Sequence, residues 1–171
     1  MNRSKRIAFV AHCLLNSNSK VIGYAEESGA IVRVIQPYID AGVGIIQLPC
    51  PEMTFLGLER WGMTYNQYDT PAYRRHCHKL LIPIVDQIQM YAENGYCIEA
   101  ILGIEGSPSC GVTFTFTGYT GGRMNSLFGS CEQASTCLAS SKISAKGVFI
   151  DELEQLLLQR KITIPITGIE E

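Results

Sequence analysis

The chain has 171 residues, of which 46% are hydrophobic, and its formal net charge is −2. This length and composition predict one compact domain over residues 1–171, and the charge argues against a basic surface for nucleic acid or an anionic membrane. No apolar run reaches the roughly 20 residues that a membrane-spanning helix needs. We expect a cytoplasmic protein that binds neither nucleic acid nor membranes, with self-association left open.

The N-terminal apolar stretch resembles a signal peptide only superficially. It is short, and His12, Cys13 and Asn16 follow where a cleavage site of small residues would lie. We interpret it as the first strand. The chain contains seven cysteines, an odd and unevenly spaced set. In the absence of a secretion signal this pattern argues against a disulfide framework and favours metal binding or redox chemistry.

Apolar runs predict four strands, and apolar positions repeating at intervals of three and four predict three helices. The strands are expected near residues 6–12, 45–48, 97–104 and 162–166, and the helices near residues 28–41, 71–94 and 148–160. Residues 112–117 fit a short strand or an extended loop, residues 118–130 a loop or lid, and residues 131–140 a short helix.

Strands that alternate with helices are typical of a parallel sheet covered on both faces. We therefore predict a single-domain α/β fold. It is a three-layer sandwich with a mainly parallel sheet of about four to five strands and helices on both faces. In open sheets of this kind, ligands bind beyond the carboxyl ends of the strands.

Three cysteines follow three of the predicted strands. Cys13 comes after the first strand, Cys50 after the second and Cys110 a few residues after the third. Because neighbouring parallel strands lie about 4.8 Å apart, the loops at their carboxyl ends can converge. The sequence therefore predicts that these three sulfur atoms share one site.

A cation is needed to gather three thiolates. Two unit charges about 4 Å apart repel by roughly 4 kcal/mol at an effective dielectric constant of about 20. Soft sulfur ligands favour zinc or an iron–sulfur cluster, and three ligands in place of four leave one coordination position open for chemistry. The alternative is that the cysteines are inert buried residues. We assign that role to Cys77, on an apolar helix face, and to Cys97, at the start of a buried strand.

Three short motifs resemble the thiouracil desulfidase family and its uncharacterised relatives. They are Cys13-Leu14-Leu15, Cys50-Pro51-Glu52 and Ser107-Pro108-Ser109-Cys110-Gly111, in the family's order. The last motif is fairly specific when it follows a buried strand, whereas the first two are informative only as part of the ordered set. The motifs span residues 13–111 of the chain.

The resemblance implies a [4Fe-4S] cluster bound by Cys13, Cys50 and Cys110, with one open iron site. It also implies a non-redox replacement of sulfur by oxygen in a small thiocarbonyl substrate, with release of hydrogen sulfide. The family's catalytic carboxylate and serine correspond to Glu52 and Ser107. The chain departs from the family pattern at Asn16, where glycine is common, and in residues 52–60 and 63–73. Thiouracil itself is therefore one candidate among several thiolated compounds.

Three further residues are candidates for substrate binding, each with a purely structural alternative. Asn16 lies near the first cysteine and is otherwise a turn former. Glu105 is a second candidate base, or it accepts backbone hydrogen bonds in the turn after its strand. Ser109 is a candidate for contact with the substrate. Like Ser107, it either orients water or hydrogen-bonds the cluster sulfurs, or it builds the turn. Aromatic side chains that could stack on a flat substrate, or pack in the core, are those of Tyr65, Tyr68 and Tyr119.

Three other functions fit the same residues. One is a zinc hydrolase with three cysteine ligands and a zinc-bound water. The second is a non-enzymatic iron–sulfur sensor or sulfur-carrier module, and the third is a small-molecule-binding domain with buried free thiols. Metal analysis separates the first from a desulfidase, and turnover of a thiolated compound separates the others.

Overall fold

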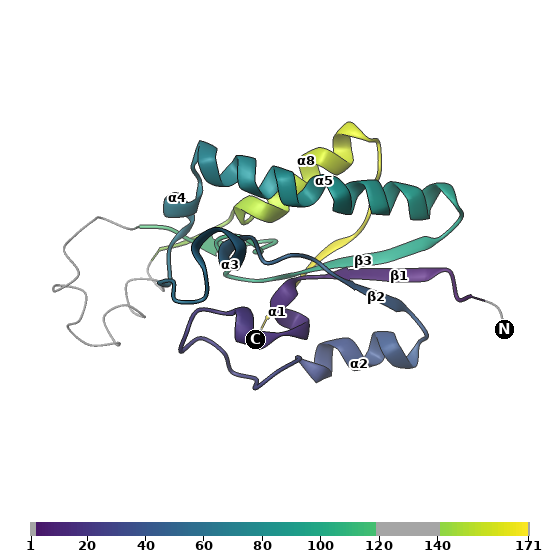
Figure 1. The fold of residues 1–171 in the computed structure, drawn as a ribbon, viewed down its shortest axis with the longest axis horizontal. Helices are drawn as coiled ribbons and strands as arrows, with labels where there is room; N and C mark the ends of the chain where they lie inside the picture. The colour runs from purple at the N-terminus through teal and green to yellow at the C-terminus, as the bar shows by residue number, and fades with distance from the viewer. Residues whose placement is uncertain (1–2, 119–140, 171) are drawn as a thin grey trace.

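The computed structural model describes residues 3–118 and 141–170 (Figure 1). A four-stranded sheet contains β1, β2, β3 and β6, and β4 and β5 form a separate two-stranded ribbon. The strands are β1 (Arg6–Val10), β2 (Gly44–Gln47), β3 (Cys97–Ile104), β4 (Thr115–Phe116), β5 (Lys142–Ile143) and β6 (Ile166–Ile169). The helices are α1 (His12–Leu15), α2 (Val32–Asp40), α3 (Pro51–Leu56), α4 (Tyr65–Tyr68), α5 (Pro71–Glu93) and α8 (Val148–Gln159), with a 3-10 turn, η1 (Ser17–Ser19).

The sheet has the strand order β2-β1-β3-β6, and every pair in it is parallel. In Figure 1, α5 and α8 cover one face of the sheet and α1 and α2 lie on the other. The predicted α/β sandwich with a parallel sheet is therefore confirmed. Since β1 lies between β2 and β3, the three strands that precede the three cysteines are direct neighbours. Their carboxyl ends meet at the edge where α1 and α3 begin.

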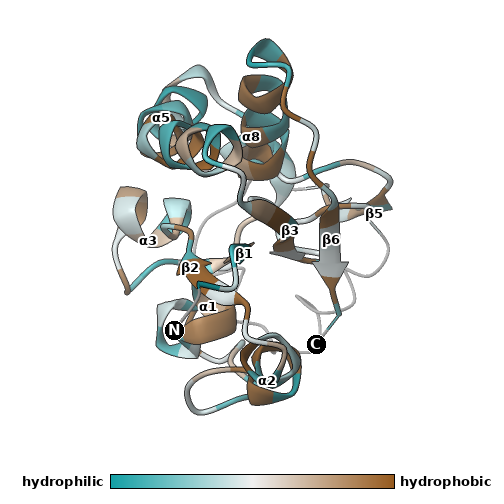
Figure 2. Ribbon diagram, turned by 90° about the vertical axis from the view of Figure 1, so that its right-hand side faces the viewer, coloured by the Kyte–Doolittle hydropathy of each residue, from teal (hydrophilic) through white to brown (hydrophobic). Residues whose placement is uncertain are grey.

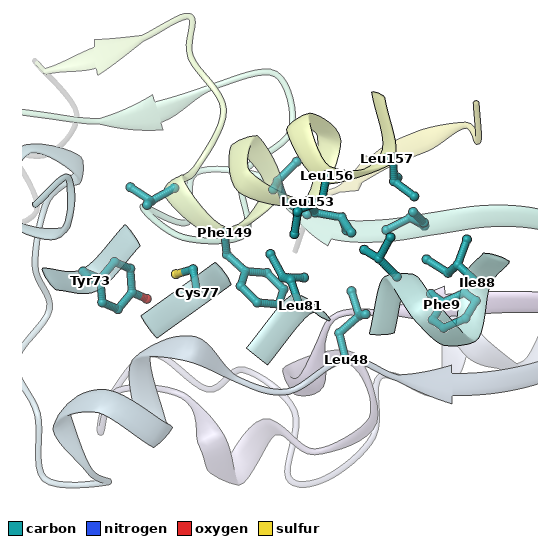
Figure 3. Packing of buried hydrophobic residues seen from close by; sticks show 14 of the residues in the cluster. Phe9, Leu48, Tyr73, Cys77, Leu81, Ile88, Phe149, Leu153, Leu156 and Leu157 are labelled. Atoms are coloured by element: carbon teal, nitrogen blue, oxygen red, sulfur yellow. The ribbon is translucent and has the colours of Figure 1, made fainter. Parts of the chain in front are cut away.

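Two apolar layers sandwich the sheet. The larger layer joins α5 and α8 to the sheet through Phe9, Cys77, Leu81, Phe149 and Leu153, all fully buried (Figure 3). In Figure 2, β2 and β3 are largely coloured as hydrophobic, whereas the outer side of α5 is coloured as hydrophilic. The second layer packs α1 and α2 beneath the sheet, through residues that include Val10, Leu14, Ile31, Ile35 and Leu102.

Longer elements follow the sequence pattern closely. Helix α5 begins at Pro71, with Thr70 accepting a hydrogen bond from the Tyr73 amide, and β3 has the predicted bounds. The predicted apolar face of α8 is buried. Residues 112–117 include the short strand β4. The loop predicted at 118–130 and the helix at 131–140 fall almost entirely outside the described residues.

Three details of the prediction are wrong. The first strand ends at Val10, and His12 begins a one-turn helix. The last strand lies at Ile166–Ile169, because Pro165 has no amide hydrogen and contributes only its carbonyl, which accepts from the Ile101 amide at 2.9 Å. Cys97 is exposed, since burial in β3 begins further along the strand. Among residues 3–118 and 141–170, no helix combines the length and hydrophobicity that crossing a membrane requires.

Candidate functional site

Cys13 lies shortly beyond the end of β1, one of the two inner strands of the sheet. After β1 ends, the Ala11 amide still donates to the Leu102 carbonyl of β3 at 2.8 Å, so the chain remains attached to the sheet. Helix α1 then turns the backbone, and buried Leu14 anchors it in the core. Cys13 is partly exposed on this turn. Its position is therefore fixed by the sheet on one side and the apolar layer on the other.

Cys50 occupies the N-cap position of α3. Its backbone is extended, Pro51 takes the first helical position, and the Cys50 sulfur accepts a hydrogen bond from the Met53 amide at 3.4 Å. Proline suits this position because the first helical amides have no partner within the helix. The Cys50 sulfur thus lies at the end of the helix where a negative charge is favoured.

Cys110 is held in a tight turn after β3. The Ser107 hydroxyl accepts a hydrogen bond from the Cys110 amide at 3.0 Å, and the Cys110 carbonyl accepts one from the Ile104 amide at 2.9 Å. Glycines surround the turn. A Cβ on Gly111 would lie 2.7 Å from the Ser107 carbonyl oxygen, and one on Gly147 would lie 2.8 Å from the Cys110 amide nitrogen. The turn therefore packs closely against the backbone of these two glycines, where a side chain would not fit.

The three cysteines line one cavity of about 300 Å³. This volume is at the lower end of the range for small-molecule sites. Glu52 and Ser107 line the same cavity, as do side chains that were not predicted from the sequence, among them Ser19, Lys20, Tyr24, Arg60, Met63 and Phe116. The predicted convergence of the loops is therefore seen in the structure. None of the described cysteines is in a disulfide.

The thiols influence one another electrostatically. Burial, followed by the neighbouring Cys13 and Cys50, raises the pKa of Cys110 well above its usual range. Burial also raises the pKa of Cys50, opposed in part by the hydrogen bond from the Met53 amide. Without a cation these two thiols keep their protons at neutral pH. A metal centre that binds here has to displace these protons, because the sulfur ligands of a metal are thiolates.

The donor set fits an iron–sulfur cluster. Three sulfur donors on three separate segments face one cavity, which is mostly apolar and also has room for a small ligand. Within residues 3–118 and 141–170, no three cysteine, histidine or acidic side chains approach closely enough to form a single-ion site. If a cluster is present, Cys13, Cys50 and Cys110 are the residues that would hold it. Cys131 and Cys137 lie outside the described residues.

Glu52 belongs to a buried charged network that includes Arg60 and Tyr68. Its Oε2 atom accepts from Arg60 Nε at 3.2 Å and from the Tyr68 hydroxyl at 3.2 Å. The Arg60 side chain is 3% exposed and that of Glu52 is 12% exposed. Because a buried charge needs a partner, Arg60 balances the carboxylate in the cavity wall. Arg60 lies eight residues beyond Glu52, and no short motif marks such a pair.

Glu105 lines the cavity and also builds the loop beside it. Its Oε2 atom accepts from the amides of Val112, Thr113 and Phe114, and its Oε1 atom accepts from the Thr113 hydroxyl. Both oxygens are therefore engaged, as the structural alternative for this residue predicted. Burial acts to raise the pKa of Glu105, but the hydrogen bonds outweigh burial and lower it.

We expect Glu105→Gln to destabilise the protein by about 1–3 kcal/mol at pH 7, because a charged acceptor is lost. A lowered pKa in the folded state means that the carboxylate stabilises the fold above its unfolded pKa of about 4.3 and that this stabilisation fades as the pH falls further. Urea unfolding of both proteins between about pH 7 and pH 3 measures this effect. The difference between their free energies of unfolding should narrow below about pH 4. A difference that stayed constant with pH would contradict the assignment.

Two predicted binding residues lie away from the cavity. Ser109 is fully buried, and its hydroxyl is 2.8 Å from the Tyr73 hydroxyl. This hydrogen bond ties the turn to α5. Asn16 accepts a hydrogen bond from the Asn18 amide and caps η1. Neither is among the residues that line the cavity. Their substrate-binding role stays a prediction, and their contacts are those of the turn-forming alternative.

The predicted aromatic residues have other surroundings. Tyr68 is 2% exposed and packs against Tyr73, with ring centroids 4.7 Å apart. Tyr65 approaches Arg74 with its hydroxyl, and Tyr119 lies outside the described residues. Among the described residues, the aromatic rings that line the cavity belong to Tyr24 and Phe116. Both lie outside the three cysteine motifs, so the motifs alone do not mark them.

Together these features define an α/β protein with a three-cysteine cavity at the carboxyl edge of a parallel sheet. The chain is 44% identical over 110 residues to the uncharacterized protein MJ0003 of Methanocaldococcus jannaschii, covering 64% of this chain and 70% of that protein. It belongs to the same family as MJ0003. No protein-family model matches the chain.

A solved structure gives a second comparison. The fold resembles that of the [4Fe-4S]-dependent thiouracil desulfidase TudS, with a TM-score of 0.46 and 18% sequence identity. The similarity covers 94% of this chain and 90% of that one.

Proposed function

We propose that the protein is a [4Fe-4S]-dependent desulfidase that replaces the sulfur of a small thiocarbonyl compound with oxygen from water. The observation that carries the proposal is the convergence of Cys13, Cys50 and Cys110 on one cavity that also contains Glu52 and Ser107. The ordered motifs around these residues support it. When bound, the cluster would supply a Lewis-acidic iron site that binds sulfur.

The reaction consumes water without net oxidation or reduction. The carbon–sulfur bond breaks and a carbon–oxygen bond forms, so that R₂C=S and H₂O give R₂C=O and H₂S. Water needs a base to become an effective nucleophile. Glu52 is the carboxylate in the cavity wall, and its Oε1 atom has no hydrogen-bond partner among the described residues. We assign to this oxygen the acceptance of a proton from the attacking water.

The Ser107 hydroxyl can act as a hydrogen-bond donor in the cavity. Its oxygen accepts hydrogen bonds from the Ser109 and Cys110 amides, at 3.3 and 3.0 Å, while its own proton has no acceptor within the described part of the chain. Because the two amides fix the oxygen, the hydroxyl proton can be donated to a substrate or water in the cavity. Ser107 would thereby both hold the Cys110 turn and orient a reactant.

The test is anaerobic reconstitution with iron and sulfide, followed by counting of both. The loaded protein is then incubated with thiouracil and with thioacetamide, and released sulfide is measured. We expect about four irons per chain and sulfide release from at least one thiocarbonyl compound. Zinc binding without iron would instead favour the zinc hydrolase. An iron-loaded protein that releases sulfide from no thiocarbonyl compound would favour the sensor or carrier module.

A further inference from the structure

The Glu52 carboxylate is held asymmetrically. Both of its hydrogen bonds, from Arg60 Nε and from the Tyr68 hydroxyl, converge on Oε2. The other oxygen, Oε1, accepts no hydrogen bond within the described residues. A carboxylate bound through one oxygen keeps its remaining acceptor capacity for another donor. In a cavity that would hold the reacting water, this asymmetry separates the oxygen that anchors from the oxygen that can react.

Arg60 forms a rigid support for this arrangement. Its Nη2 atom donates to the Ser19 carbonyl at 2.7 Å, and its Nη1 atom donates to the Gly57 carbonyl at 3.2 Å. The guanidinium therefore links η1, the end of α3 and Glu52. It is planar and does not lose its proton in proteins. With a side chain that is 3% exposed, it has little freedom to move away from the carboxylate.

Tyr68 supplies the second contact from α4. The residue is 2% exposed, and its ring packs against that of Tyr73. Burial, followed by the nearby Glu52 charge, raises the pKa of Tyr68 above its ordinary value. The phenol therefore stays protonated and donates to Glu52. Since the ring is locked by packing, the hydroxyl fixes where Oε2 lies.

We propose that Arg60 and Tyr68 are positioning residues that hold Glu52 by Oε2 and leave Oε1 aimed at the reacting water. This inference rests on the proposed desulfidase function. Both residues act through Glu52 and need not touch the substrate. Because a displacement of about 1 Å can cost about 10²-fold in rate, their loss should lower kcat more than it changes KM.

The experiment compares Tyr68→Phe with Tyr65→Phe. Both substitutions remove one hydroxyl from the same short helix, but the Tyr65 hydroxyl contacts Arg74 and not Glu52. After reconstitution, iron content and sulfide release from thiouracil and thioacetamide are measured. We expect Tyr68→Phe to keep its iron and its KM within about twofold while kcat falls about tenfold or more, the effect of losing a hydrogen bond to a charged group. Tyr65→Phe should match the unmodified protein.

A double-substitution cycle shows whether Tyr68 acts through Glu52. In a Glu52→Gln background, Tyr68→Phe should cause little further loss of kcat. The same four proteins are compared by urea unfolding, which needs no substrate. In these unfolding measurements, the effect of the double substitution on the unfolding equilibrium constant should differ by about threefold or more from the product of the two single effects.

The outcomes separate the two proposals. Suppose that the unmodified chain releases sulfide. If Tyr68→Phe then has the same kcat, or if the losses of kcat caused by Tyr68→Phe and Glu52→Gln multiply in the double variant, the positioning role is overturned and the desulfidase function stands. An absence of unfolding coupling also overturns the positioning role. If the unmodified, iron-loaded chain releases no sulfide from either probe, both proposals fall.

Discussion

Replacing Cys110 with serine is expected to abolish cluster binding and sulfide release. Cys110 is held by Ser107 in a turn that faces the cavity shared with Cys13 and Cys50. Serine retains the size of the side chain but offers a hard oxygen donor where iron prefers sulfur. Altering even residues that support a metal ligand costs about 10- to 100-fold in affinity or activity, so loss of a ligand should cost at least about 100-fold. Iron content and visible absorbance after anaerobic reconstitution are the measurements.

The matched control for Cys110→Ser is Cys97→Ser. Cys97 is exposed at the start of β3, at the opposite end of the strand from the site. The Cys97→Ser variant should bind iron and release sulfide like the unmodified chain. A Cys110→Ser protein that kept the full visible absorbance of a cluster would show that the three-cysteine ligand assignment is wrong.

The second large effect is expected from Gly147→Ala. This glycine precedes α8, has an ordinary φ of −66°, and lies against the Cys110 turn. A Cβ there would lie 2.5 Å from the Ser109 carbonyl oxygen and 2.8 Å from the Cys110 amide nitrogen. Backbone atoms cannot rotate away as a flexible side chain can. The turn or the start of α8 must therefore shift, which should destabilise the protein by about 1–3 kcal/mol and reduce its iron content.

Gly29→Ala is the control for this substitution, because a Cβ at Gly29 would have no atom within 4 Å. Urea unfolding and iron content are measured for both variants. Gly29→Ala should leave both unchanged. If Gly147→Ala showed the stability and iron content of the unmodified protein, the close contact between α8 and the cysteine turn would not be a determinant of the site.

Features that depend on local patterns were predictable from the sequence. The bounds of β3 follow from its apolar run, and the start of α5 follows from Pro71 and its cap at Thr70. Since parallel strands end on one edge, the approach of Cys13, Cys50 and Cys110 to a common cavity also followed from their positions after strands.

Features that depend on contacts between distant residues were not predictable. Nothing in the local sequence pairs Arg60 with Glu52 and Ser19, because buried charges find partners through tertiary structure. Ser109 lies beside a cysteine, yet its hydroxyl is hydrogen-bonded to that of Tyr73, which lies on α5 and precedes it by 36 residues. The last strand was misplaced because apolar residues before Pro165 pack on the core without joining the sheet.

The support that Gly147 gives to the Cys110 turn has a consequence for the order of assembly. The three cysteines follow parallel strands that are far apart in the sequence, and the turn of the last cysteine packs against Gly147, just before α8. A nascent chain that ends before Gly147 contains all three cysteines but lacks the segment that packs against the Cys110 turn. The cavity that they line is therefore supported in full only after α8 has been added.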